Sequence, residues 1–100
     1  MFTGIITDIG EVIGREGGRF AIRSGYEAHA IAAGASIACD GCCLSVTTVR
    51  PDGTGSAFTV DASNETLSAT TLGSWQPGRR VNLEIDLLAR YLARLMEFGP

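Results

Sequence analysis

The chain has 100 residues, of which 45% are hydrophobic and 19% are charged, and its net charge is -3. These values suit one packed domain and oppose intrinsic disorder. No basic run is present, so nucleic acid is a poor candidate partner, and no apolar stretch is long enough to span a bilayer. The start, MFTGIITDIG, has neither the positive region nor the continuous apolar region of a signal peptide, so we expect a cytoplasmic protein.

The beginning of the chain has the alternation and the turns of an antiparallel sheet. We expect a long first strand over residues 2–14, apolar on both sides in places, with Gly10 at a bulge or a bend. The segment REGG is a hairpin turn. The segment RFAIRS is then a second strand, in which Phe20 and Ile22 face inward.

The middle of the chain continues the strand pattern after an irregular or helix-tolerant segment at residues 25–34. The segment ASIAC is a third strand, and Asp40-Gly41 is a strong turn signal. The segment CCLSVTTV is a fourth strand with alternating faces. RPDGTG is a turn that Pro51 begins, and SAFTVDA is a fifth strand.

A short helix is expected in SNETLSATTLG, before a sixth strand in VNLEI. Ser63 or Asn64 caps this helix, Leu67 faces the core, and Gly73 ends it. Six short strands with frequent turns indicate an all-β protein, a six-stranded antiparallel barrel that closes its own edges.

The last segment, DLLARYLARLMEF at residues 86–98, has the composition of a helix. An apolar seam runs along it with the spacing of a coiled coil, at Ile85, Leu88, Leu92 and Leu95. Two heptads are marginal as an isolated coil. The helix therefore either folds back on its own barrel or associates with the same helix of other chains.

Three cysteines, Cys39, Cys42 and Cys43, lie within five positions. Cys42 and Cys43 are adjacent, so in a strand their side chains leave opposite faces. Zinc normally takes four ligands, and His29 is the only histidine in the chain, so we expect no metal site within one chain. Cys39 and one of the other two are expected to fill core space, and the remaining cysteine can line a cavity.

Four blocks in matching order, MFTGII, GASIACDGCCLSVT, SNETLSATTLG and GRRVNLE, closely resemble the N-terminal half of riboflavin synthase. The resemblance covers residues 1 to about 84. It implies a Greek-key barrel at residues 1–84 that binds 6,7-dimethyl-8-ribityllumazine or riboflavin. In the family, two such barrels face each other, and two lumazines give riboflavin and a pyrimidinedione without a metal or an added cofactor.

The rest of the chain departs from the family pattern. The second barrel and the segment that leads to it are not found, and VNLEIDLLARYLARL resembles the end of the complete enzyme. Residues 85–100 are therefore expected to form an amphipathic C-terminal oligomerisation helix. The resemblance implies a homo-oligomer, a trimer through this helix or a dimer of barrels, either in a natural short relative or in an engineered single barrel.

The resemblance also assigns site residues. Near the reacting rings it implies Phe2, Ser36 and Cys43. The ligand-binding residues that it implies are Gly4, Ile5, Ile6, Cys43, Leu44, Ser45, Asp61, Ala62, Ser63, Asn64, Glu65 and Thr66. Taken alone, each has an ordinary structural interpretation: Glu65 suits helix capping, Ser45 a strand, Gly4 a bend, and the isoleucines a core. No family role transfers to His29.

Three functions follow from these assignments. The first is an oligomeric module that binds lumazine or riboflavin with little or no turnover. The second is a working riboflavin synthase built from identical barrels. The third is a structural or assembly role that depends on the C-terminal helix.

Overall fold

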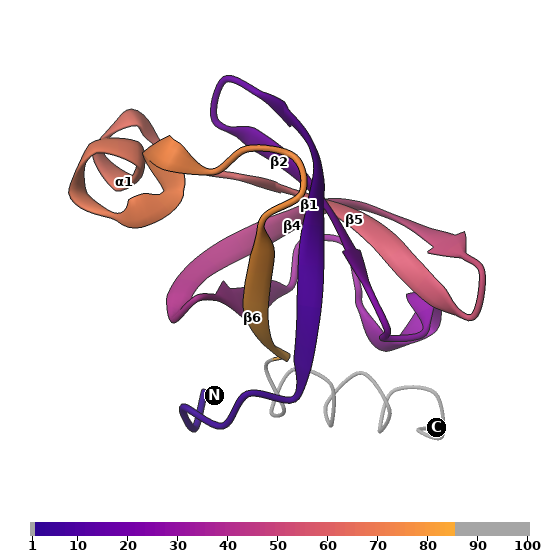
Figure 1. Cartoon of the computed structure of the whole chain (residues 1–100). Helices are drawn as coiled ribbons and strands as arrows, with labels where there is room; N and C mark the ends of the chain where they lie inside the picture. The colour runs from indigo at the N-terminus through magenta and orange to yellow at the C-terminus, as the bar shows by residue number, and fades with distance from the viewer. Residues whose placement is uncertain (1, 86–100) are drawn as a thin grey trace.

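The computed structural model describes residues 2–85, which form a closed barrel of six antiparallel strands (Figure 1). The strands are β1 (Asp8–Glu16), β2 (Arg19–Ser24), β3 (Ser36–Cys39), β4 (Cys42–Asp52), β5 (Gly55–Asp61) and β6 (Arg80–Ile85). Around the barrel they follow the order β1-β2-β5-β4-β3-β6. Strands β3, β4 and β5 are successive neighbours, and β6 returns to lie beside β3, which is the Greek-key order. The predicted all-β, six-stranded Greek-key barrel is confirmed.

The core is filled by the inward residues of the strands and by Trp75. Phe20 and Ile22 are fully buried, as their alternation in β2 predicts. Trp75 is also fully buried and meets Phe20 edge to face, with ring centroids 5.5 Å apart and planes at 72°. This geometry is favourable for two aromatic rings. A residue outside the strands thereby completes the core.

The first strand begins later than the sequence predicts. β1 starts at Asp8, and residues 2–7 form a loop, because Gly4 has a φ of +83° and turns the chain. The bulge in β1 lies between Val12 and Gly14 rather than at Gly10. Gly10 instead permits a close approach, since a Cβ there would lie 2.7 Å from the Arg23 carbonyl oxygen.

Two other predicted boundaries are wrong. β4 continues through Pro51, which pairs with Ser56, so the turn to β5 lies at Gly53-Thr54 and not at Pro51. The helix α1 (Asn64–Ala69) ends before Gly73, because Thr70 is extended and caps a separate 3-10 turn, η2 (Thr71–Ser74). The predicted cap at Ser63 is confirmed, since its hydroxyl accepts from the Thr66 N–H.

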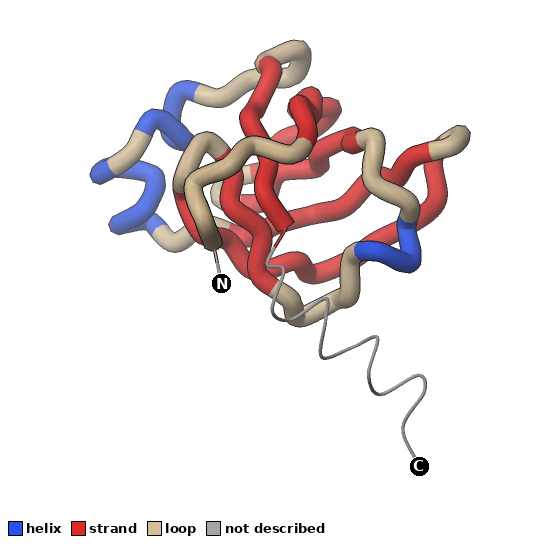
Figure 2. Tube along the Cα trace, turned by 90° about the horizontal axis from the view of Figure 1, so that it is seen from below, coloured by secondary structure: helices blue, strands red, loops and turns tan. Residues whose placement is uncertain are grey.

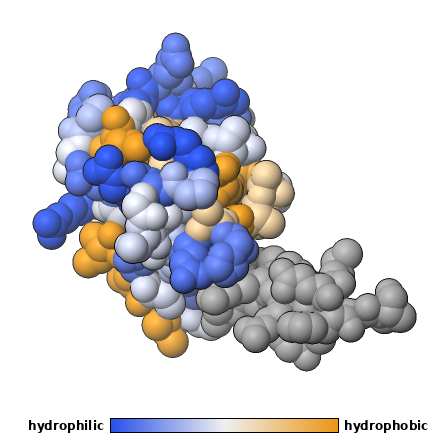
Figure 3. Space-filling model, turned by 90° about the vertical axis from the view of Figure 1, so that its right-hand side faces the viewer, coloured by the Kyte–Doolittle hydropathy of each residue, from blue (hydrophilic) through white to orange (hydrophobic). Residues whose placement is uncertain are grey.

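The helices lie at opposite sides of the barrel. Figure 2 shows α1 and η2 together on one side, and the 3-10 turn η1 (Ala28–Ala30), which interrupts the predicted irregular segment, on the other. None of the helices within residues 2–85 is long and apolar enough to cross a membrane. The face shown in Figure 3 is mostly hydrophilic, with apolar residues in separate small groups.

The predicted C-terminal helix over residues 86–98 lies outside the described residues. Ile85, the first residue of its expected seam, is the last residue of β6. Its side chain is 6% exposed and packs in the core. The barrel itself therefore uses Ile85.

Candidate functional site

Three polar side chains from three neighbouring strands stand in one row on the outer face of the barrel. Ser45 in β4 lies directly opposite Ser36 in β3 and opposite Asp61 in β5. Directly opposite residues in antiparallel strands point to the same side of a sheet. The side chains of Ser36, Ser45 and Asp61 therefore lie side by side on the same face of three neighbouring strands.

A second row runs beside the first and contains Cys43. In β4, Cys43 pairs with Ala38 of β3, which in turn pairs with Glu84 of β6. Cys43 is exposed, whereas Glu84 is only 5% exposed. Cys43 and Ser45 share the outer face because they are two residues apart in one strand.

The backbone of β4 has an open edge at this position. The ladder between β4 and β5 begins at Ser45 opposite Asp61, so residues 42–44 have no partner residue in β5. The reason is that the chain leaves the sheet after Asp61 and enters α1. Leu44 packs in the core and is 5% exposed as a whole residue, so only a small part of its backbone is accessible at this edge, whereas the neighbouring Cys43 is exposed. Backbone N–H and C=O groups of this kind can bind a flat ring with amide-like edges.

Two shallow depressions flank the rows. One, of about 350 Å³, lies on the β6 side and is lined by Gly4, Ile6, Ala38, Asp40, Asn82 and Glu84, among others. The other, of about 430 Å³, lies on the β2 side and is lined by Glu16, Gly18, Arg19, Asp61 and Ala62. Both volumes fall in the range of small-molecule sites. The outer face therefore has room for a ligand on both sides of its polar row.

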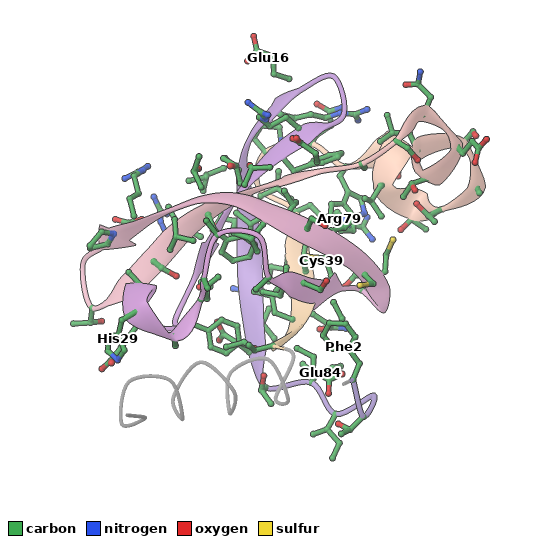
Figure 4. All side chains as sticks on the ribbon, turned by 180° about the vertical axis from the view of Figure 1, so that it is seen from behind. Phe2, Glu16, His29, Cys39, Arg79 and Glu84 are labelled. Atoms are coloured by element: carbon green, nitrogen blue, oxygen red, sulfur yellow. The ribbon has the colours of Figure 1, made fainter. Side chains whose placement is uncertain are left out.

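The N-terminal loop is fastened to the β6 side of this face by Glu84. The Glu84 carboxylate accepts hydrogen bonds from the Thr3 N–H at 2.7 Å, the Thr3 hydroxyl at 2.7 Å and the Gly4 N–H at 3.0 Å. Figure 4 shows Phe2 beside Glu84, on the side of the barrel away from His29. Ile5 and Ile6 are 66% and 53% exposed, which contradicts an ordinary core role and leaves both side chains accessible.

Hydrogen bonds from Thr3 and Gly4 lower the pKa of the Glu84 carboxyl below its ordinary value of 4.5. A carboxyl whose pKa is lower in the folded than in the unfolded state stabilises the fold at every pH above its ordinary pKa. This contribution is lost as the pH falls through the folded-state pKa. The melting temperature of wild type should therefore exceed that of Glu84→Gln at neutral pH. The difference should shrink in acid below pH 4.5. Thermal scans of both proteins across pH would check this, and a constant difference would contradict it.

Asp61 is held from the other side by Arg19. Arg19 Nε donates to Asp61 Oδ1 at 2.8 Å and Arg19 Nη2 donates to Asp61 Oδ2 at 3.1 Å. This two-pronged hydrogen bond is the main cause that lowers the pKa of Asp61. The Asp61 carboxylate is thus ionised and held in one position. Both of its oxygens already accept hydrogen bonds from Arg19 when a ligand approaches.

The remaining residues predicted for the ligand surround the start of α1. The Ala62 N–H donates to the Gly18 carbonyl at 2.8 Å, and the Thr66 N–H donates to the Ser63 hydroxyl at 3.1 Å. The Thr66 N–H is therefore already engaged in the cap of α1. Ser63 performs the capping, and no side-chain hydrogen bond of Glu65 is found within the described part of the chain. The exposed Glu65 is thus available to a polar partner.

Two of the three cysteines pack against the core, as the sequence predicts. Cys39 is fully buried in the core cluster, and Cys42 packs against that cluster. Burial raises the pKa of Cys39 to about 12, with smaller contributions from Cys42 and Asp40. Burial also raises the pKa of Cys42. Cys43 is the exposed cysteine and lies on the same outer face as Ser45.

We expect a single thiol of the folded protein, Cys43, to react rapidly with Ellman's reagent. The thiolate is the reactive form, and burial suppresses both access and ionisation at Cys39. Cys43→Ser should remove the fast phase, whereas Cys39 should react only after denaturation. Mass spectrometry of the labelled protein identifies the site, and rapid labelling of Cys39 in the native state would contradict the assignment.

Two residues of this face were missed by reasoning from sequence, Glu84 and Arg19. Glu84 was in the block GRRVNLE, and its place between inward Leu83 and Ile85 indicates that it faces outward. Nothing in the local sequence pairs Arg19 with Asp61, which is 42 residues away. His29 is exposed and contacts Glu27 at 3.0 Å, far from this face in Figure 4. Within residues 2–85 no three His, Cys, Asp or Glu side chains gather as a metal site requires.

The comparisons with known proteins agree with this geometry. The lumazine binding domain family matches residues 3–86 of the chain. A riboflavin synthase of Brucella abortus is 47% identical over 92 residues, which cover 87% of this chain and 46% of the relative. A riboflavin synthase of Mycobacterium bovis is 47% identical over 84% of this chain and 42% of its own length, and one of Bacillus subtilis is 41% identical over 89% and 41%.

The chain is a closed Greek-key β-barrel with a row of polar side chains on its outer face, beside a stretch of β4 that has no partner in β5. It belongs to the lumazine-binding domain family and is a riboflavin synthase-like barrel. The chain spans less than half the length of the curated relatives described above.

Proposed function

We propose that this barrel binds 6,7-dimethyl-8-ribityllumazine or riboflavin on its outer face and acts as one half of a riboflavin synthase site. The observation that carries the proposal is the open edge of β4 at residues 42–44, next to the row of Ser36, Ser45 and Asp61. The ring would bond to the backbone of Cys43 and Leu44. The ribityl hydroxyls would reach the hydroxyls and carboxylates of Ser45, Glu65 and Thr66.

In the proposed reaction, one lumazine molecule transfers a four-carbon unit to a second lumazine, which gives riboflavin and a pyrimidinedione without an added cofactor. Holding two reactants in a productive geometry can supply about 7–11 kcal/mol of the barrier. The chain would supply Phe2, Ser36 and Cys43 near the reacting rings, with Cys43 as a nucleophile or a polarising group. The barrel would bind one ring, and a second barrel would present the other.

A homo-oligomer is part of this proposal, because two binding faces must meet for two rings to react. Either a trimer or a dimer of barrels would satisfy it. Analytical ultracentrifugation with and without riboflavin distinguishes these states. A strict monomer that nonetheless forms riboflavin would reject the need for assembly.

The binding test is a titration with riboflavin, followed by the quenching of flavin fluorescence. We expect saturable binding at micromolar concentrations. Ser45→Lys should abolish it, because a long charged side chain would cover the open edge, whereas Thr54→Lys, in the distant turn between β4 and β5, should bind as wild type does. The absence of saturable quenching by wild type would reject the proposed function.

Turnover is measured separately, by incubation with 6,7-dimethyl-8-ribityllumazine and absorbance detection of riboflavin. Formation above the uncatalysed background, lost in Cys43→Ala, would support catalysis by the chain. Binding without riboflavin formation would reduce the function to that of a ligand-binding module.

A further inference from the structure

The carboxylate of Glu84 is nearly buried and lies beside the proposed site. A carboxylate with little contact with water is stable only when hydrogen bonds replace its hydration. Glu84 is 5% exposed, and within residues 2–85 its carboxylate accepts three hydrogen bonds, two from Thr3 and one from Gly4, which are 81 and 80 residues away in the chain. Its other strand contacts are those of the β6 ladder, where it lies opposite Ala38.

The three hydrogen bonds hold the first part of the N-terminal loop, at Thr3 and Gly4, against β6. The Thr3 hydroxyl donates to Glu84 and also accepts from the Ile5 N–H at 3.1 Å. Through Thr3, the Glu84 carboxylate therefore also helps to fix the backbone at Ile5. Gly4 adopts a φ of +83°, which suits glycine and brings its N–H to the second carboxylate oxygen. One carboxylate on β6 thus holds the turn that presents Phe2 and Ile6.

The anchor lies in the row that leads to the proposed binding edge. Glu84 pairs with Ala38, and Ala38 pairs with Cys43. The depression on this side is lined by Gly4, Ile6 and Glu84, so loop and strand enclose it together. If the loop were released from Glu84, Gly4 and Ile6 would no longer line the depression on this side of the proposed site.

From this geometry we infer that Glu84 is a positioning residue for the ligand. It holds residues 2–6 against the binding face, and the affinity for a flavin or lumazine depends on it through the loop. The hydrogen bonds are made to an ionised acceptor, which strengthens them relative to neutral pairs. This inference rests on the proposed function, because it concerns the same ligand site.

The test combines binding with the state of the loop. Glu84→Gln replaces one acceptor oxygen by an NH₂ group, which cannot accept from Thr3 or Gly4. We expect riboflavin affinity to fall by about tenfold or more. The amide protons of Thr3 and Gly4 should lose their protection from hydrogen exchange, as observed by NMR. Glu27→Gln, which neutralises an exposed carboxylate beside His29, should leave affinity and protection unchanged.

A second set of variants separates positioning from direct ligand contact. Thr3→Val removes the hydroxyl and should weaken binding, whereas Thr3→Ser retains it and should restore wild-type affinity. Because Glu84 acts through Thr3 and Gly4, the double variant Glu84→Gln/Thr3→Val should bind no more weakly than Glu84→Gln alone. The Thr3 variants also test the inference if Glu84→Gln fails to fold.

Three results would overturn the inference. They are wild-type affinity in Glu84→Gln, a loss of affinity while the Thr3 and Gly4 amides stay protected, and fully additive losses in the double variant. Any of these, with riboflavin bound by wild type, would reject the role of Glu84 and leave the proposed function intact. A wild-type chain that does not bind riboflavin at all would reject the proposed function and this role with it.

Discussion

Replacing Phe20 with alanine is expected to lower the free energy of unfolding by about 3–5 kcal/mol. Phe20 is fully buried, meets Trp75 edge to face, and carries the Arg15 guanidinium 5.0 Å from its ring centroid. Removal of the Phe20 ring should leave a cavity beside Trp75. Trp75 and Arg15 would both lose their contact with that ring. Small domains have total stabilities of about 5–15 kcal/mol, so this variant should be close to unfolding at room temperature.

Urea denaturation followed by circular dichroism measures this loss. Ile9→Ala is the matched control, because Ile9 is 57% exposed and its truncation should change the unfolding free energy by less than about 0.5 kcal/mol. Similar losses in the two variants would contradict the central position of Phe20 in the core.

The second large effect is expected from Gly18→Ala, which should destabilise the protein by about 1–3 kcal/mol and weaken riboflavin binding. A Cβ at residue 18 would lie 2.3 Å from the Ala62 carbonyl oxygen, a contact that backbone movement alone can relieve. The moving segment is the one that leads from Asp61 into α1, and its Ala62 N–H is bonded to the Gly18 carbonyl. Stability and affinity should therefore fall together.

Gly14→Ala provides the control for Gly18→Ala in the same hairpin. A Cβ at residue 14 would meet only the Ala21 Cβ, at an ordinary contact distance of 3.6 Å. We expect near wild-type stability and affinity for this variant. A melting temperature for Gly18→Ala equal to that of Gly14→Ala would show that the close approach to Ala62 is easily relieved.

The sequence by itself determined most of the secondary structure, because strand alternation, turn residues and helix caps act over a few residues. Phe20 and Ile22 alternate with outward residues and are buried, Asp40-Gly41 forms the turn between β3 and β4, and Ser63 caps α1. The prediction failed where a distant group decided the local conformation. Residues 2–7 have the composition of a strand but form a loop, in which Gly4 turns the chain and Glu84 binds Thr3 and Gly4.

The site could be predicted only in its parts. Four blocks of sequence indicated which residues belong to the site. Which of these residues lie next to one another depends on how the barrel closes. The register places Ser36, Ser45 and Asp61 in one row, and the departure of the chain after Asp61 leaves the edge of β4 open. Glu84 binds Thr3, which is 81 positions away in the chain, and Arg19 binds Asp61, which is 42 positions away. Contacts at such separations leave no local periodicity in the sequence, so only the tertiary structure could decide them.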